Sequence, residues 1–271
     1  MPDAKNPVSP SGAVFDEISD YWAEIAEAHD TEKQVAFAKN SLDQTGVVLD
    51  LGCGSGRHAI RLSKMGYDVV GLDISHRLLK IALAKAKEAE SCLALVRADM
   101  RFLPFTTDIF HGVISLDSTL GYFPSEDDDR RSLKEVARTL VEGNVFLLDV
   151  FNGERMFSGS YKLRFQDLLF PLAKFSGLFM LFRWSEYPSF YLLQRRKIAK
   201  SNGMLNDTWI IRDKNAKRTF VAKHMVRLYV SAQLQKLLLE SGLRTSKIFG
   251  DYMEEGFSKD SKRIIIIAEK A

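Results

Sequence analysis

The residues of this 271-residue chain that most clearly predict chemistry are three alternating glycines that follow a carboxylate. The segment VVLDLGCGSGRHA, Val47–Ala59, begins with an apolar run typical of a buried strand and continues through Asp50 to Gly52, Gly54 and Gly56. Glycines at such a turn let the backbone approach a bound ligand closely. In an open parallel sheet, ligands bind beyond the carboxyl ends of the strands, near the point where strand order reverses. The segment therefore predicts a ligand site at this turn.

The spacing and charge of this turn indicate which ligand it would hold. The glycines follow the pattern G-x-G-x-G, whereas the dinucleotide fingerprint is G-x-G-x-x-G. Asp50 would repel a pyrophosphate but suits a ligand that carries an ammonium and a sulfonium. The charge argument thus favours S-adenosylmethionine over NAD, and an NAD-dependent oxidoreductase is the alternative.

Two more carboxylates follow the next two predicted strands. Asp73 ends the second strand in VVGLDIS, where an acidic side chain can accept hydrogen bonds from both ribose hydroxyls, although a dinucleotide fold uses the same position and a helix-capping role is the structural alternative. Asp99 follows the third strand, and it could accept a bond from an adenine amino group while Met100 packs on the ring. Both positions indicate an adenosine ligand.

Alternation of β-rich and helix-like runs across 46–150 is typical of βαβ units on a parallel sheet. The runs that predict strands are Val47–Leu51, Tyr67–Leu72, Leu93–Val96, Val113–Leu116 and Val145–Val150. Their apolar character indicates that helices cover both faces of the sheet. Ser75 and Ser125 are predicted helix caps, and Gly66 and Gly143 lie where helices commonly end.

The second half of the chain has a different sequence pattern. Over 152–228, aromatic and charged residues alternate, which predicts antiparallel strands inserted after the fifth strand. A helix over 231–241 and strands over 243–249 and 264–267 follow. We therefore expect an N-terminal tail with cap helices (1–45), a ligand-binding domain (46–151 and 229–271) and an inserted substrate or lid segment (152–228).

Composition excludes several classes of protein. Lys and Arg exceed Asp and Glu by only three and are spread along the chain, so charge alone does not predict a nucleic-acid partner. The basic cluster QRRKIAK, 194–200, is typical of a solvated face, and binding of RNA or an acidic substrate is its alternative. Two cysteines provide neither a disulfide framework nor a zinc site, so we expect a cytoplasmic protein without a metal. The apolar segment Leu168–Phe182 is too short to span a membrane and fits buried packing, a lid or a lipid-facing patch. The first dozen residues lack a signal peptide and predict a frayed tail.

Several segments together resemble the class I S-adenosylmethionine-dependent methyltransferases. The resemblance runs through VLDLGCGSGRHAIRLSKMGYDVVGLDIS, RADMRFLPF, FHGVISLDSTLGYF, LKEVARTLVEGNVFLLDVFN and SKRIIIIAEK, with a departure at 141–144, where the family usually has a Pro-Gly-Gly turn. It implies a doubly wound α/β fold whose seven-stranded, mainly parallel sheet has the order 3-2-1-4-5-7-6, with the last strand antiparallel. It also implies S-adenosyl-L-methionine as the cofactor.

The resemblance extends the predicted donor site beyond the residues argued above. The predicted cofactor-binding residues are Tyr21, Asp50, Gly52, Cys53, Gly54, Gly56, His58, Asp73, Ile74, Asp99, Met100 and Leu116. Aromatic faces can stabilise a sulfonium, and Tyr21, Trp22 and Tyr122 are the candidates. His58 is expected to line the donor site without acid–base work.

Methyl transfer from a sulfonium is an in-line displacement, so few residues need special chemistry. The predicted catalytic residues are Asp117, Tyr122 and His224, with Arg227 and Tyr229 on the same exit strand as His224. The segment DSTLGYF lacks the Asn/Asp-Pro-Pro-Tyr/Phe tetrad, which disfavours a DNA adenine or glutamine acceptor. We expect a small-molecule acceptor, with a helix over 15–29 and the insertion closing over it, in a monomer or homodimer. The alternatives are a protein or RNA acceptor, and a non-catalytic binding protein.

Overall fold

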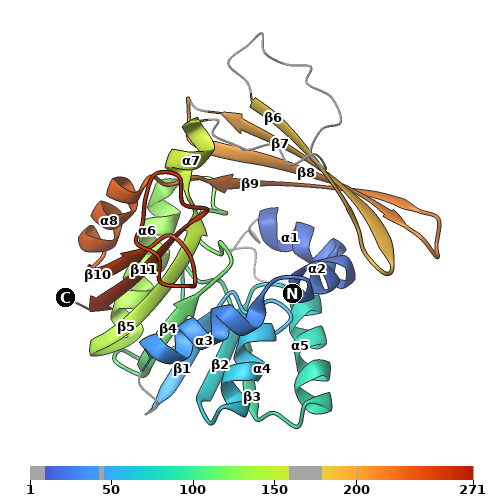
Figure 1. The fold of residues 1–271 in the computed structure, drawn as a ribbon. Helices are drawn as coiled ribbons and strands as arrows, with labels where there is room; N and C mark the ends of the chain where they lie inside the picture. Colours follow the sequence, from blue (N-terminus) through green and yellow to red (C-terminus); the bar gives the residue numbers. More distant parts are fainter. Residues whose placement is uncertain (1–9, 43–45, 159–178, 200, 271) are drawn as a thin grey trace, which may run out of the picture.

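A seven-stranded sheet forms the centre of the molecule (Figure 1). The computed structural model describes residues 10–42, 46–158, 179–199 and 201–270. The strands are β1 (Val47–Leu51), β2 (Asp68–Asp73), β3 (Leu93–Arg97), β4 (Phe110–Ser115), β5 (Leu140–Phe151), β10 (Leu243–Phe249) and β11 (Arg263–Lys270). Their order is β3-β2-β1-β4-β5-β11-β10, and β11 runs antiparallel to both neighbours. Counted within this sheet, the order is 3-2-1-4-5-7-6, which confirms the predicted topology.

Helices cover both faces of this sheet, as its apolar strands predict. On one face, α3 (Thr31–Ser41) and α4 (Arg57–Lys64) pack against alternate strand residues such as Val48 and Ile114. On the other face, α6 (Glu126–Thr139) and α8 (Ser231–Glu240) pack against the residues in between, such as Leu49. The period-2 alternation of a strand thus divides the core into two layers.

The two predicted serine caps determine where two helices begin. The hydroxyl of Ser75 accepts the Leu78 amide at 3.1 Å and starts α5 (His76–Glu88). The hydroxyl of Ser125 accepts the Asp128 amide at 3.2 Å and starts α6, whose first turn carries four acidic residues where the helix dipole favours them.

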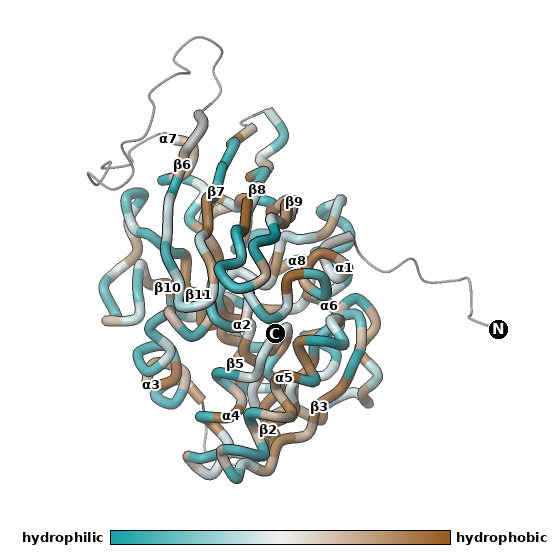
Figure 2. The backbone as a smooth tube through the Cα atoms, turned by 90° about the vertical axis from the view of Figure 1, so that its right-hand side faces the viewer, coloured by the Kyte–Doolittle hydropathy of each residue, from teal (hydrophilic) through white to brown (hydrophobic). Residues whose placement is uncertain are grey.

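A second, antiparallel sheet lies beside the first. It contains β6 (Phe179–Glu186), β7 (Phe190–Ala199), β8 (Met204–Asp213) and β9 (Thr219–Arg227), in that order, and α7 (Gly153–Ser158) precedes it. The helices α1 (Pro10–Glu17) and α2 (Ser19–Glu27) pack on its inner face. An apolar cluster that includes Ile18, between the two helices, and Trp209 of β8 joins the helices to this sheet. Figure 2 shows the apolar stretches of β7, β8 and β9 side by side.

Several local predictions are wrong. The single helix expected over 15–29 is divided at Ile18, whose buried side chain anchors the bend between α1 and α2, and α1 begins at Pro10 within the expected tail. Gly143 does not end a helix, because α6 stops at Thr139 and Gly143 lies in an irregular, positive-φ part of β5. Most of the apolar segment 168–182 lies outside the described residues.

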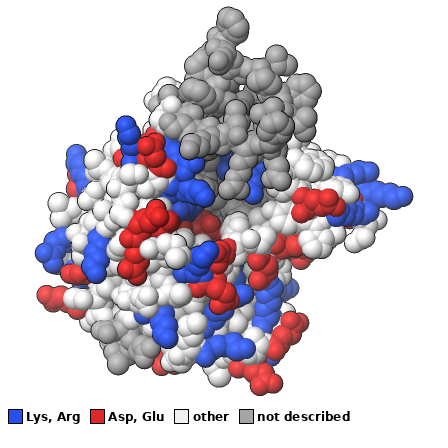
Figure 3. All heavy atoms as spheres, in the orientation of Figure 1, with Lys and Arg blue, Asp and Glu red and all other residues white. Residues whose placement is uncertain are grey.

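The charges on the visible surface are mixed in sign (Figure 3), as the near-neutral composition predicts. Among the described residues, no helix is long and apolar enough to cross a membrane. Within the same residues, no group of three or more His, Cys, Asp and Glu side chains is arranged to hold a metal ion.

Candidate active site

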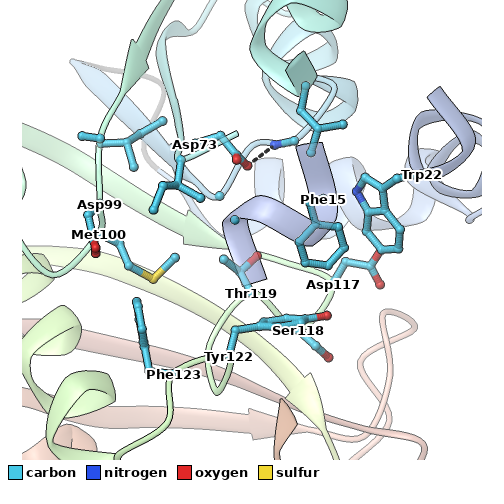
Figure 4. A pocket seen from close by; sticks show the side chains of 17 residues that line it. Phe15, Trp22, Asp73, Asp99, Met100, Asp117, Ser118, Thr119, Tyr122 and Phe123 are labelled. Atoms are coloured by element: carbon cyan, nitrogen blue, oxygen red, sulfur yellow. Dashed lines mark hydrogen bonds between the residues drawn. The ribbon is translucent and has the colours of Figure 1, made fainter. Parts of the chain in front are cut away.

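A pocket of about 720 Å³, counting the part open to solvent, lies at the carboxyl ends of β1, β2 and β4 (Figure 4). We call it the donor pocket. The residues that line it are Gly12, Phe15, Trp22, Gly52, Gly54, Leu72, Asp73, Ile74, Leu78, Ala98, Asp99, Met100, Asp117, Ser118, Thr119, Tyr122 and Phe123. At Gly52 the backbone has a φ of 75°, and a Cβ would collide with the Thr119 methyl group, so glycine is required there.

Asp73 ends β2 with its carboxylate fixed at the pocket wall. Its Oδ2 accepts the amide of Gly54 at 2.8 Å, and its Oδ1 accepts the amide of Ser75 at 2.8 Å. The first bond joins the glycine turn to the second strand (Figure 4). Burial raises the pKa of Asp73 above its ordinary value, while these amide bonds oppose that rise. Each carboxylate oxygen has a second lone pair that can accept a bond from a ligand hydroxyl.

Asp99 and Met100 lie at the end of the donor pocket opposite Asp117 (Figure 4). The Asp99 carboxylate forms a bidentate pair with Arg101, with Nη2 at 2.7 Å from Oδ2 and Nε at 3.1 Å from both oxygens. Arg101 also binds Asp128 at 3.0 Å. Because Asp99 is already anchored, an adenine amino group there would share its oxygens with Arg101.

Asp117 and Ser118 form a strained turn at the end of β4. Both adopt left-handed backbone conformations, with φ of 61° and 65°, which costs roughly 1–3 kcal/mol for each non-glycine residue. The Asp117 amide donates to Asp149 Oδ2 at 3.0 Å, and the Ser118 amide donates to the Asp149 carbonyl at 3.0 Å. Arg263 binds both Asp149 oxygens, at 2.6 and 2.8 Å, and the Ser118 hydroxyl at 2.7 Å. The buried ion pair of Asp149 and Arg263 therefore holds this turn at the wall of the pocket.

The carboxylate of Asp117 is unsuited to act as a general base. Its Oδ2 lies 2.6 Å from His29 Nδ1 and 3.0 Å from Arg57 Nη2. Burial opposes ionisation, but the hydrogen bond from His29 and the nearby cations outweigh it and hold the pKa of Asp117 well below its usual range. Asp117 is therefore a permanently charged acceptor of hydrogen bonds, suited to a ligand ammonium.

Aromatic side chains form the wall of the donor pocket nearest the second sheet. The Phe15 ring lies 5.2 Å from that of Trp22 and 5.5 Å from that of Tyr122, centroid to centroid. Two consecutive helices and the distant loop after β4 thus meet at one face (Figure 4). The sequence indicates Trp22 and Tyr122 but not Phe15, because the short segment of α1 carries no local pattern that marks Phe15.

The structure divides the predicted donor-site residues into two groups. Those that line the donor pocket are Gly52, Gly54, Asp73, Ile74, Asp99 and Met100, together with the predicted catalytic residues Asp117 and Tyr122. Those outside its lining are Tyr21, Asp50, Cys53, Gly56, His58 and Leu116.

Contacts elsewhere account for two residues of the second group, and also for Tyr229 of the predicted exit strand. The Tyr21 hydroxyl turns toward the second sheet and donates to Asp213 at 2.7 Å. His58 is buried with Nε2 at 2.9 Å from Gln34 Oε1, and burial holds its pKa well below the ordinary value. Tyr229, which follows β9, is a core residue whose hydroxyl donates to Asp129 at 2.8 Å.

Asp50 gives a testable pH dependence. It is 1% exposed, its Oδ2 has no partner, and burial raises its pKa from 3.8 to about 7. A raised pKa means that Asp50 stabilises the fold fully only below about pH 4, and this contribution is lost as the pH rises through 7. We expect Asp50→Asn, which resembles the protonated acid, to gain stability relative to the wild type between pH 4 and 8. Urea unfolding of both proteins across that range measures the difference, and a constant difference would contradict the assignment.

A second pocket adjoins the donor pocket through Tyr122 and Phe123. We call it the acceptor pocket; its space is about 1410 Å³, including open solvent. The described residues that line it are Val14, Tyr122, Phe123, Pro124, Arg195, Lys197, Met204, Asn206, Asp207, Thr208, Lys223, His224 and Met225. They come from α1, from the loop after β4 and from three strands of the second sheet. His224 therefore lies beside the donor pocket, as a member of the adjoining site.

The residues of the donor pocket fit S-adenosylmethionine. An apolar end beside Met100 suits an adenine ring, the Asp73 carboxylate suits ribose hydroxyls, and the ionised Asp117 suits an ammonium. Aromatic faces at Phe15, Trp22 and Tyr122 suit a sulfonium. A glycine turn, three strand-end carboxylates and an aromatic wall on this sheet are the features expected of a methyltransferase that binds this donor.

Comparisons with known proteins agree. Residues 48–143 match a family described as "Methyltransferase domain". The chain is 30% identical over 174 residues to the 2-phytyl-1,4-naphtoquinone methyltransferase of Nostoc punctiforme, covering 61% of this chain and 72% of that protein. It is 35% identical over 120 residues to the glycine/sarcosine N-methyltransferase of Parasynechococcus marenigrum, covering 43% and 42%. The fold is similar to that of the CcbJ methyltransferase from Streptomyces caelestis, with a TM-score of 0.77, 17% identity, and coverage of 98% and 100%.

The chain belongs to the class I S-adenosylmethionine-dependent methyltransferases. Its cofactor is S-adenosylmethionine.

Proposed function

We propose that this enzyme transfers the methyl group of S-adenosylmethionine to a nitrogen, oxygen or carbon atom of a small molecule. The observation that supports this most directly is the acceptor pocket, which meets the donor pocket at Tyr122. A pocket lined by α1, a loop and three strands of the second sheet suits a small molecule. In this proposal the N-terminal helices (within 1–45) and the insertion (152–228) form the acceptor side, and the remainder of the chain forms the donor side.

The donor supplies a methyl group on a sulfonium, and the chain's residues hold and orient the reactants. Asp73 anchors the ribose, Asp99 and Met100 bound the adenine, and Asp117 receives the ammonium. Phe15, Trp22 and Tyr122 exclude water and face the sulfonium. The relatives named for glycine/sarcosine and for a naphtoquinone support a small-molecule acceptor for this chain as well.

An RNA acceptor is the second candidate. Arg195, Lys197 and Lys223 line the acceptor pocket, and a cationic rim can bind phosphate. A tRNA (carboxymethyluridine(34)-5-O)-methyltransferase from Arabidopsis thaliana is 29% identical over 142 residues, which are 52% of this chain and 32% of that protein. The same three cations would equally suit an anionic small molecule.

Two experiments test the proposal. Calorimetric titration with S-adenosylmethionine, S-adenosylhomocysteine and NAD should give micromolar binding of the first two and none of the third. Methyl-labelled S-adenosylmethionine should then label the small-molecule fraction of a cell extract, and leave the RNA and protein fractions unlabelled. Label in RNA or protein would replace the proposed acceptor class, and donor binding without any transfer would favour a non-catalytic binding protein.

A further inference from the structure

Three charged or titratable side chains lie in register across the inner face of the second sheet. Arg196 on β7 pairs with Asp207 on β8, and Asp207 pairs with His224 on β9. Asp207 is 2% exposed and His224 is 8% exposed. This buried row faces α1 and the loop that carries Tyr122.

Two atoms of this row have no hydrogen-bond partner. Asp207 Oδ2 accepts from Arg196 Nε at 2.8 Å, but Asp207 Oδ1 has no partner. His224 Nε2 lies 3.9 Å from Asp207 Oδ2, and His224 Nδ1 has no partner. A buried polar atom left unpaired costs about 1–3 kcal/mol. Two such atoms on neighbouring residues of one pocket point to a ligand that supplies their partners.

The surrounding rings place these atoms beside the methyl donor. The Tyr122 and Phe15 rings each lie 5.8 Å from the His224 ring, and both residues also line the donor pocket. On the other side, Trp209 meets the imidazole edge to face at 5.0 Å and stacks on Trp22 at 5.4 Å. The imidazole is therefore held between the two pockets, and His224 and Asp207 both line the acceptor pocket.

Both unpaired atoms can act as hydrogen-bond acceptors. The Asp207 carboxylate beside Nε2 favours the tautomer with hydrogen on Nε2, which leaves the Nδ1 lone pair free. Burial is the main cause that lowers the pKa of His224 to about 4; the charge of Asp207 opposes this shift, and the charge of Arg196 adds to it. Besides these two groups, the Tyr122 side chain faces the imidazole from the loop after β4. His224 is thus neutral at pH 7.

We propose that Asp207 Oδ1 and His224 Nδ1 together bind the two N–H groups of an amine acceptor, so that the enzyme is an N-methyltransferase. This inference rests on the proposed small-molecule function. A hydroxyl has one proton and would leave one of the two atoms unpaired. A neutral primary amine has two protons for the pair and a lone pair left to attack the methyl carbon. The N–C bond forms as the S–C bond breaks, the sulfonium becomes a thioether, and the proton lost by nitrogen passes by way of His224 Nδ1 to solvent, because the neutral imidazole does not retain it. Besides binding the acceptor through Oδ1, Asp207 orients the imidazole through the charge of Oδ2.

The test uses the full-length enzyme with S-adenosylmethionine that carries a carbon-13 methyl group, and the small-molecule fraction of a cell extract. The methyl resonance of the product identifies the atom that receives the label. We expect nitrogen. Label on oxygen or carbon would overturn the inference while leaving the proposed function standing, and label on sulfur would overturn both. No transfer to any small molecule would overturn both.

Two variants then test the residues with the acceptor that this experiment identifies. His224→Gln and Asp207→Asn should each lower kcat about 100-fold, in the range of a lost general base, with donor affinity unchanged. Retained donor affinity also shows that the variants fold. His76→Gln, an exposed histidine at the start of α5, is the matched control and should keep full activity.

The pH profile separates positioning from a merely structural role. Because the charge of Asp207 raises the pKa of His224, Asp207→Asn should move the acidic limb of the kcat profile to lower pH. An unmoved limb, or a kcat within threefold of the wild type in either variant, would contradict the assignment.

Discussion

Arg263→Ala is expected to lower the free energy of unfolding by about 3–5 kcal/mol, the usual cost of breaking a buried ion pair. Arg263 donates to both oxygens of Asp149, which is 0% exposed, so the variant would leave that carboxylate buried without its cation. The hydrogen bond from Tyr252 at 2.6 Å compensates only in part. Urea unfolding at pH 7 measures the loss.

The same variant should also weaken donor binding. Arg263 donates to the Ser118 hydroxyl, and Asp149 holds the amides of Asp117 and Ser118 in their strained turn. Without the pair, the turn can relax out of the pocket wall. Calorimetric titration with S-adenosylhomocysteine, below the temperature at which the variant unfolds, measures this effect.

Arg244→Ala is the matched control for the ion pair. Its pairing with Glu269 is 3.4 Å long, and its side chain is 68% exposed. A solvent-exposed pair of this kind contributes at most about 1 kcal/mol. If Arg263→Ala cost no more than Arg244→Ala, the buried pair would not be the element that holds the turn.

Asp73→Ala is expected to weaken the binding of S-adenosylmethionine by roughly 1–3 kcal/mol, or about 5- to 150-fold in Kd. The variant removes the acceptors of the ribose hydroxyls and also the bond from the Gly54 amide at 2.8 Å that shapes the glycine turn. Both losses act on the donor, so the KM of the donor should rise while the acceptor's KM changes little.

Asp68→Ala provides the control, because Asp68 begins the same strand and is exposed. It should bind the donor as the wild type does. Equal affinity of Asp73→Ala and the wild type would show that the ribose lies elsewhere.

The sequence by itself determined the fold class and the end of the sheet at which the donor binds. Periodic apolar strands, serine caps and the glycine turn are local signals, each written within a few residues, and they predict β1 to β5 and the positions of Asp73 and Asp99. The resemblance to class I methyltransferases added the strand order. Local sequence patterns cannot provide this order, because strands distant in the chain meet only in the folded sheet.

Local signals do not reveal a residue's distant partners. The sequence predicts Asp117 as a catalytic residue, and only the fold shows its contacts with His29 and Arg57, which keep its carboxylate charged. Tyr21 and Trp22 are adjacent in sequence, yet α2 turns only Trp22 toward the donor pocket.

Only the tertiary structure decided what surrounds His224. Its neighbours Asp207 and Tyr122 come from a different strand and from a loop about a hundred residues earlier in the chain, and the unpaired atoms of the row exist only once those elements pack. Burial, pKa and hydrogen-bond satisfaction are properties of that packing rather than of any short segment. The sequence could therefore locate the glycine turn at the donor pocket. The residues proposed to bind the acceptor could be identified only from the folded structure.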